Sequence, residues 1–243
     1  EAKISSKHRF YNRKDEHTNS KSIMRVMSEL NSLRKNLPNN WDSSILMRIH
    51  KSNLNLITFL IIGPKDTPYH NGVYEFHAYF PNNYPDSPPK VLLDTTDGGR
   101  VRFNPNLYNC GKVCLSLLGT WSGEKGESWH KDISTFLQVL ISIQSLIMVE
   151  NPYFNEPGYE KSMNTPSGQS RNFDYTDNIR LENIRVAMLG MLKSKNEYSE
   201  FIREHFRLKK EEIFSTINQW ISESKTKKNE MVKYFELLKE ELA

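Results

Sequence analysis

The chain has 243 residues, 37% of them hydrophobic and 11% aromatic, which is enough for one well-buried domain with additions or for two small domains. Its net charge of +4 comes from 33 basic and 29 acidic residues mixed along the chain, which argues against a nucleic-acid-binding protein. No apolar run reaches the roughly 18 residues that a membrane helix needs, so we expect no membrane insertion.

The N-terminus has no apolar core of the kind found in signal peptides, and only two cysteines are present. Together these features predict a reducing, intracellular and cytoplasmic setting in which both thiols stay free. Because the chain does not begin with methionine, we expect a fragment of a longer protein.

The first 20 residues are polar and predict a flexible lead-in with nothing to bury. A helix is predicted next, because apolar residues then recur at helical spacing up to the helix-ending Pro38. They are Ile23, Val26, Met27, Leu30 and Leu33.

Four short segments that are rich in β-branched or aromatic residues follow, each bounded by turn residues. They cover residues 44–50, 54–62, 72–80 and 90–96. Connections this short favour an antiparallel meander, since a parallel pair needs a crossover of a dozen or more residues. In the third segment, Val73, Glu75, His77 and Tyr79 alternate with Tyr74, Phe76, Ala78 and Phe80. We expect one of these two faces to be core and the other to be at least partly wet.

A long irregular region over about residues 96–132 contains both cysteines, and such segments inside compact domains are usually functional. Residues 134–149 then predict a central buried helix, apolar nearly all round, with Ser134 as its cap.

After a loop dense in Pro, Gly and Asn over residues 150–170, the pattern is helical to the end of the chain. Helices are predicted at about 177–193, 197–207, 209–223 and 228–242. In the last helix, Met231, Phe235, Leu238 and Leu242 line one edge, and we favour packing back onto the domain over a coiled-coil partner. The predicted division is a lead-in (1–20), a core domain (21–165) and a helical extension (166–243).

Cys110 and Cys114 could form a disulfide, bind a metal or supply one reactive thiol. The reducing setting argues against the disulfide. A zinc site needs about four ligands, and only His130 could join the cysteines, so we expect no metal. Cys110 sits in a turn-like tetrapeptide, and its default interpretation is a partly exposed bystander.

Cys114 is the better candidate for chemistry. A thiol with a reference pKa of roughly 8.5 is a good nucleophile toward activated acyl groups, and thioester exchange needs no adjacent histidine base. A cysteine protease would need such a histidine, with His130 the only one in the loop, and is disfavoured.

The segment NPNLYNCGKVCLSLLGTW resembles the active-site segment of ubiquitin-conjugating enzymes, where a cysteine follows an asparagine by eight residues and precedes a tryptophan by seven. Asn106, Cys114 and Trp121 reproduce both spacings. Residues 63–91 are similar to the family's Gly-Pro turn, strand entry and proline-rich loop. The likeness is greatest to the giant Apollon/BRUCE-type enzymes, hybrids of conjugating enzyme and ligase.

The resemblance implies an α/β (α+β) ubiquitin-conjugating fold: an N-terminal helix, a four-stranded antiparallel meander sheet, the cysteine loop, a central helix and a helical C-terminal extension. It implies that Cys114 accepts ubiquitin as a thioester from the activating enzyme and passes it to a substrate lysine. No cofactor is expected, because ATP is consumed upstream. The expected partners are ubiquitin, its activating enzyme and protein substrates with acceptor lysines.

By the same resemblance, Asn106 would stabilise the oxyanion, or would tie down the loop through its hydrogen bonds, and the two roles are compatible. Asn104 replaces the usual histidine, and Pro105 and Tyr108 would shape the loop. Trp121 would serve in packing.

Glu150, or an acid within GEKGESW, could help to position or deprotonate the acceptor lysine. Asp86 stands where many members carry an aromatic residue for RING-type ligases, so any ligase would dock through an atypical surface. The alternative function is a catalytically silent ubiquitin-binding adaptor of the same fold, although such variants generally lack the cysteine.

Overall fold

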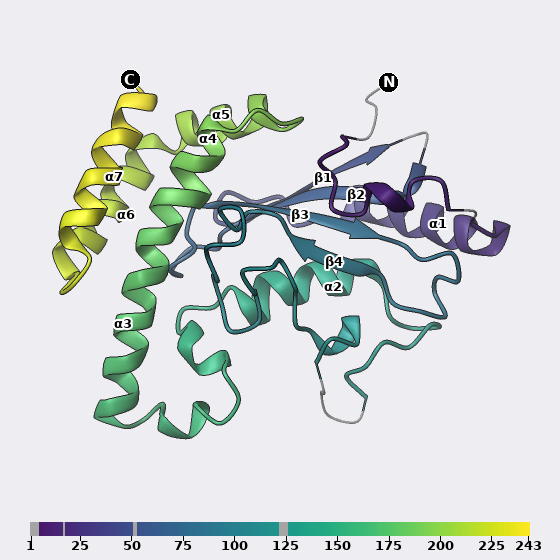
Figure 1. Cartoon of the computed structure of the whole chain (residues 1–243), viewed down its shortest axis with the longest axis horizontal. Helices are drawn as coiled ribbons and strands as arrows, with labels where there is room; N and C mark the ends of the chain where they lie inside the picture. The colour runs from purple at the N-terminus through teal and green to yellow at the C-terminus, as the bar shows by residue number, and fades with distance from the viewer. Residues whose placement is uncertain (1–4, 17, 51–52, 122–125) are drawn as a thin grey trace.

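A four-stranded antiparallel sheet in the order β1-β2-β3-β4 lies at the centre of the computed structural model, which describes residues 5–16, 18–50, 53–121 and 126–243. Its strands are β1 (Ile45–His50), β2 (Asn53–Ile62), β3 (Val73–Tyr79) and β4 (Lys90–Leu93). The helices are α1 (Ser20–Asn36), α2 (Phe136–Ser142), α3 (Pro166–Glu182), α4 (Met191–Lys193), α5 (Ser199–Leu208), α6 (Lys210–Glu223) and α7 (Lys228–Glu241). In Figure 1, α2 lies against one side of the sheet and α3 to α7 gather at one end.

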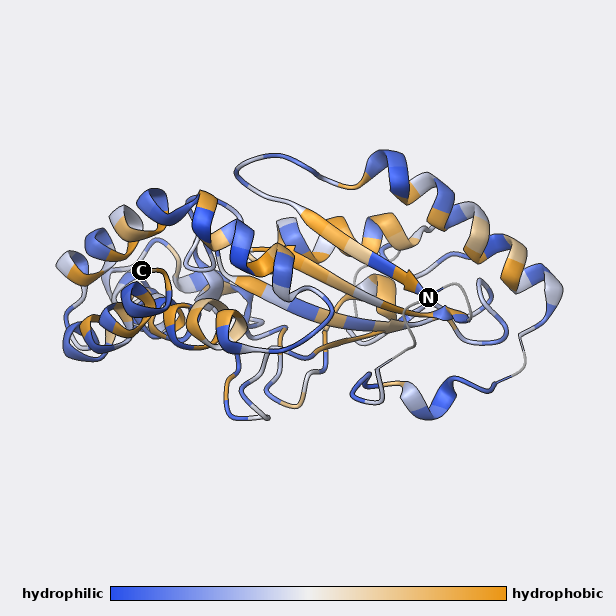
Figure 2. Cartoon of the chain, turned by 90° about the horizontal axis from the view of Figure 1, so that it is seen from above, coloured by the Kyte–Doolittle hydropathy of each residue, from blue (hydrophilic) through white to orange (hydrophobic). Residues whose placement is uncertain are grey.

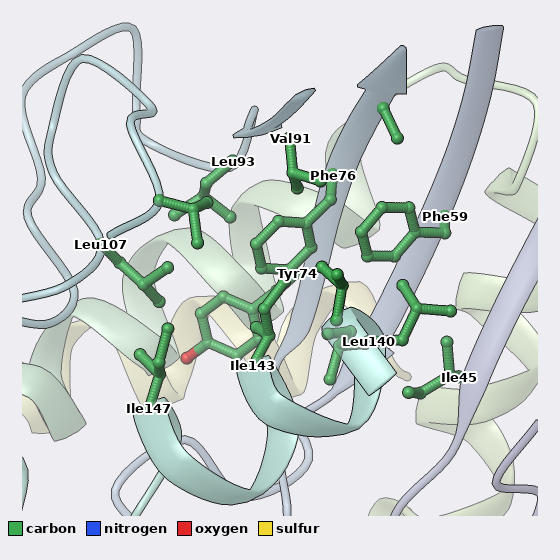
Figure 3. Packing of buried hydrophobic residues seen from close by; sticks show 14 of the residues in the cluster. Ile45, Phe59, Tyr74, Phe76, Val91, Leu93, Leu107, Leu140, Ile143 and Ile147 are labelled. Atoms are coloured by element: carbon green, nitrogen blue, oxygen red, sulfur yellow. The ribbon is translucent and has the colours of Figure 1, made fainter. Parts of the chain in front are cut away.

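The predicted meander is confirmed, because each strand pairs with the next along the chain. The register places Phe59 opposite Phe76, and Phe76 opposite Leu93. The fourth strand ends at Leu93, three residues earlier than predicted. These aligned side chains form the middle of the interior, with the Phe59 and Phe76 rings stacked at 5.1 Å (Figure 3).

The inner face of the sheet is covered by α1 and α2, as the sequence predicts for a first helix and a central one. Asn19 caps α1 by accepting a hydrogen bond from the Ser22 amide at 2.8 Å. The buried Glu29 carboxylate of α1 accepts the amide N–H of Phe136 at 2.6 Å. Because this N–H is one of the unpaired donors of the first turn of α2, the bond joins the two helices.

The start and the exposed face of the central helix differ from the prediction. The cap is Thr135, which exchanges capping-box hydrogen bonds with Gln138, whereas the Ser134 hydroxyl accepts from the His130 amide. The helix continues as a π-helical segment, Ile143–Ile147. Leu146 on that segment is 61% exposed, so the expectation of a helix buried all round is wrong.

The outer face of the sheet is mostly covered, but Glu75 of β3 is only partly buried and lines a cavity with Thr58 and His77, so the expected partly wet face is present. Leu60, Ile62 and Val73 belong to a second apolar cluster, which they form with the C-terminal helices. His77 and Tyr79 are also buried, at 3% exposure each. Figure 2 shows hydrophobic and hydrophilic residues alternating along the helices at that end, as expected for helices with one packed face.

The longest helical stretch begins 11 residues earlier than predicted. Pro166 opens α3, and the Thr165 hydroxyl caps it by accepting the Gly168 amide at 3.0 Å. Proline suits a first helical turn because an N–H at that position would find no partner within the helix, and proline carries no N–H. The sequence prediction took this residue as part of a loop. The stretch then continues through the π-helical segment Asn183–Gly190 into α4.

The prediction that the last helix packs back onto the domain is confirmed. Met231, Phe235 and Leu238 of α7 are buried within the second apolar cluster. Among the described residues, no helix is both long enough and apolar enough to cross a membrane.

The polar N-terminal segment was expected to bury nothing, yet His8 is only 4% exposed. Its ring stacks on His77 at 4.4 Å, and its Nε2 lies 3.2 Å from the Ile57 carbonyl oxygen. Its Nδ1 accepts the Phe10 amide at 3.1 Å. A ring that accepts at Nδ1 and donates from Nε2 is neutral, and burial, aided by His77, lowers the pKa of His8 to about 4.

This buried histidine predicts a pH-dependent contribution to stability. Between pH 7 and pH 5 the unfolded chain protonates its histidine at the usual pKa near 6.5, while folded His8 stays neutral. Stability therefore falls as the pH falls through this window. Between pH 7 and pH 5, we expect the free energy of unfolding in urea to drop by about 1 kcal/mol more in the wild type than in His8→Leu. This value is smaller than the full effect of the lowered pKa because solvent screens part of the interaction. Parallel losses in the two proteins would contradict this assignment.

Candidate active site

The two cysteines have different surroundings, and both are free thiols. Cys110 is exposed, as expected for a bystander, whereas Cys114 is buried at 2% exposure. A pair of hydrogen bonds holds Cys114 against Asn106. The Cys114 amide donates to the Asn106 carbonyl at 2.9 Å, and the Asn106 side-chain amide donates to the Cys114 carbonyl at 3.0 Å. The loop-tying role considered for Asn106 is thus present in the structure.

Asn104 is the central hydrogen-bonding residue of the loop and is fully buried. Its Nδ2 donates to the Tyr69 hydroxyl at 2.9 Å and to the Ile147 carbonyl at 2.8 Å, while its Oδ1 accepts the Asn106 amide at 2.8 Å. An amide side chain supplies both donors and an acceptor, which suits it to join three segments within an apolar interior. Burial also raises the pKa of the Tyr69 phenol well above its usual value, so that this group stays neutral.

The Arg102 side chain contacts both Pro105 and Tyr108. The sequence analysis did not identify Arg102 as a residue of the site. The guanidinium donates to the Asn104 carbonyl at 3.3 Å and to the Pro105 carbonyl at 2.6 Å. It also lies over the Tyr108 ring, 4.2 Å from the centroid. This cation holds one side of the loop in shape, and its contacts support the loop-shaping roles proposed for Pro105 and Tyr108.

Thr120 holds the other side of the cysteine segment and was also missed. Its hydroxyl donates to the Val113 carbonyl at 2.6 Å and accepts the Leu115 amide at 3.0 Å, which fixes the residues on either side of Cys114. Trp121, expected to serve in packing, is 39% exposed.

The alternatives to a single reactive thiol find no support in the part of the chain that the structure describes. No disulfide joins the cysteines, and neither belongs to a group of three side chains that could hold a metal. The His130 side chain is 60% exposed and lies 4.0 Å from Asp132. The site therefore consists of a buried thiol in a hydrogen-bonded loop.

Comparison with known proteins decides the family of this site. The family model described as "Ubiquitin-conjugating enzyme" matches residues 25–182, which is more than half of the chain. The chain belongs to the ubiquitin-conjugating enzyme family. The expected α/β fold and the resemblance drawn from the cysteine loop are thereby confirmed.

Relatives of this conjugating enzyme include the human "Dual E2 ubiquitin-conjugating enzyme/E3 ubiquitin-protein ligase BIRC6", 49% identical over 82% of this chain. A "Probable ubiquitin-conjugating enzyme E2 R521" of Acanthamoeba polyphaga mimivirus is 43% identical over 84% of the chain. A "Probable ubiquitin-conjugating enzyme protein 17" of Caenorhabditis elegans is 45% identical over 81%. The matched region spans 4%, 14% and 27% of these relatives, respectively.

Glu150 and the acids of the segment GEKGESW were considered as helpers of the acceptor lysine; of these, Glu124 lies outside the described residues, and the other two lie in different surroundings. Glu127, from the segment GEKGESW, accepts a hydrogen bond from the Ser116 hydroxyl at 3.3 Å, two residues beyond Cys114. Glu150 is exposed and lines a cavity with Thr176 and Arg180 of α3. Of the two carboxylates, Glu127 contacts the cysteine segment.

Asp86, which stands where many family members carry an aromatic residue, forms an exposed ion pair. Its carboxylate lies 3.3 Å from the Lys131 ammonium, and both side chains are more than half exposed. The neighbouring Pro85 carbonyl accepts the Trp129 indole N–H at 2.7 Å. The surface at this position is therefore charged rather than aromatic.

The buried hydrogen bonds of Asn104 predict a large loss of stability on truncation. We expect Asn104→Ala to lower the free energy of unfolding by about 2–3 kcal/mol, because buried donors and acceptors lose their partner. The matched control is Asn109→Ala, which removes an exposed amide that donates to the Gly99 carbonyl. In urea titrations, the control should lose less than about 0.5 kcal/mol of its free energy of unfolding. Equal losses in both variants would refute the central role of Asn104.

Proposed function

We propose that this domain accepts ubiquitin as a thioester on Cys114 and transfers it to lysine side chains of protein substrates. The observation that carries the proposal is a buried cysteine whose backbone is hydrogen-bonded to Asn106, within a chain of the conjugating family. In the transfer, the lysine amine attacks the thioester carbonyl carbon. The new C–N bond forms as the C–S bond breaks, the sulfur leaves as the Cys114 thiolate, and the amine gives its proton to a base.

Asn106 is proposed to stabilise the oxyanion of this step. Its side-chain amide carries two N–H groups, and the hydrogen bond to the Cys114 carbonyl uses one of them. The second N–H is a further donor on a residue that is hydrogen-bonded to the Cys114 backbone in both directions. A donor aimed at developing negative charge typically contributes about 10²- to 10³-fold in rate.

An acidic residue is proposed to assist the acceptor. A free lysine with a pKa of about 10.4 is almost entirely protonated at neutral pH, so its ammonium must be positioned and deprotonated at the site. The contact of Glu127 with Ser116 favours Glu127 for this role. Glu150, the candidate from the sequence, remains the second proposal.

The partners proposed for the domain are ubiquitin, the activating enzyme and protein substrates, together with ligases that dock through the Asp86 surface. The human relative is named a dual conjugating enzyme and ligase, which supports the proposal that this domain works within a larger hybrid chain. Two free cysteines support an intracellular, cytoplasmic location. The silent adaptor is disfavoured because the cysteine is present at position 114.

Charging with ubiquitin tests the proposed reaction directly. With activating enzyme, ubiquitin and ATP, we expect a thiol-sensitive adduct on non-reducing gels. The adduct should persist in Cys110→Ser and become a reductant-resistant ester in Cys114→Ser, because a hydroxyl forms an ester where a thiol forms a thioester. If the wild type failed to accept ubiquitin, the remaining functions would be a silent ubiquitin-binding adaptor or conjugation of a ubiquitin-like modifier in place of ubiquitin.

The role of Asn106 is tested by discharge of the charged enzyme to free lysine. We expect Asn106→Ala to accept ubiquitin but to discharge about 10²-fold more slowly, because the oxyanion loses a donor. Asn109→Ala is the matched control in the same loop and should discharge at the wild-type rate. If Asn106→Ala lost charging and discharge in equal proportion, its role would be confined to holding the loop.

The same discharge assay separates the two acidic candidates. Glu127→Gln is expected to slow transfer to lysine several-fold, with a smaller effect at high pH, where free lysine is already deprotonated. Glu150→Gln should behave as the wild type. The opposite pattern would assign the role to Glu150.

A further inference from the structure

Three tyrosines form a small cavity beside the cysteine loop. The cavity has a volume of about 310 Å³ and is lined by Arg102, Pro105, Tyr153, Glu156, Tyr159 and Tyr175. The Tyr153 ring lies 4.7 Å from the Tyr159 ring and 6.1 Å from the Tyr175 ring, measured between centroids. Tyr159 is 41% exposed, so the cavity opens to solvent on its side. Aromatic rings that are only partly covered offer apolar surface to a ligand.

The cavity shares a wall with the proposed catalytic loop. Pro105 lines the cavity and is followed directly by Asn106, whose amide contacts the Cys114 carbonyl. Arg102 lines it too, and its hydrogen bond to the Pro105 carbonyl fixes this wall. Adjacent Cα atoms are about 3.8 Å apart, and an extended chain advances about 3.3–3.6 Å per residue. Because the cavity and the contact to Cys114 involve neighbouring residues of one loop, a side chain in the cavity would lie within a few residues of a lysine that reaches Cys114.

The charges around the cavity define which side chain fits. Arg102 and Glu156 lie 3.6 Å apart and neutralise each other, with 41% of each side chain exposed. Aromatic faces attract cations, but the Arg102 guanidinium already lies over Tyr108 at the same wall. Because the two charges of this ion pair largely cancel, neither a cation nor an anion gains a net attraction from this wall. An uncharged apolar side chain needs no such attraction and gains contact with the rings.

We infer that this tyrosine cavity is an acceptor-side specificity pocket, which binds an apolar side chain of the substrate within a few residues of the acceptor lysine. The inference rests on the proposed transfer from Cys114. The pocket selects among acceptors by binding them beside the thioester, and it takes no part in the bond changes. Its ligand is a peptide segment with one leucine-like side chain near a lysine.

The test is single-turnover discharge of the ubiquitin-charged wild type to lysine peptides. One series carries a single leucine at each position from three residues before to three after the lysine, and the reference peptide carries alanine throughout. Below saturation, we expect the best leucine peptide to react about 5- to 10-fold faster than the reference. Burying a leucine side chain fully would be worth more than this, and the cavity is open on one side.

Tyr159→Ala tests the pocket with little risk to folding, because Tyr159 is one of the exposed large hydrophobic residues. In this variant the ratio of the rates for the leucine peptide and the alanine reference should fall to about one. The loss should come from a higher KM for the leucine peptide, with kcat unchanged. Charging and discharge to free lysine should match the wild type. Tyr159→Phe should keep the preference, and Tyr234→Ala on α7 controls for loss of a tyrosine elsewhere.

The outcomes separate this inference from the proposed function. If the wild type fails to charge with ubiquitin, the proposed function fails before any peptide is added. If charging succeeds but leucine gives no advantage, or the advantage persists in Tyr159→Ala, the specificity pocket is refuted. A preference for arginine over leucine would likewise overturn it and would assign the rings to cation binding.

Discussion

The position of Cys114 depends on one buried side-chain amide, that of Asn104. Asn104 joins the cysteine loop to the turn that carries Tyr69 and to the Ile147 carbonyl at the end of the central helix. It also accepts the amide of Asn106, which in turn contacts Cys114. Because these bonds lie within an apolar interior, breaking any of them would leave a buried polar group without a partner. The described residues of the loop form no strand or long helix of their own, yet the interior fixes their geometry.

The fold could be predicted wherever the information was local. The strands follow from short β-branched runs between turn residues, and the meander follows from their brief connections. The start of α3 at Pro166 was missed because proline and glycine indicate loops as readily as first helical turns. The outer face containing His77 could not be assigned, since its cover comes from His8 and the C-terminal helices, which are distant in sequence.

The site could be predicted to the same degree and for the same reason. The spacing of Asn106 and Cys114 is a local pattern, and the family comparison supports the likeness drawn from it. The contacts of Arg102 and Thr120 were missed because any sequence offers many polar residues, and only the folded loop shows which carbonyls they reach. A sequence signal was available for Thr120, because a threonine six residues beyond the cysteine can close a turn over it. The tyrosine cavity unites residues 102 to 175 and had no local signal.

The second apolar cluster has a consequence for the boundary predicted at residue 166. Leu60, Ile62 and Val73 belong to the sheet, yet their neighbours in the cluster come from the helical extension, for example Ile184 and Phe206. Removal of the extension would expose these strand side chains to water and leave a contiguous apolar surface. A chain cut at that point would have a strong tendency to self-associate. The C-terminal helices therefore cover apolar side chains of the sheet.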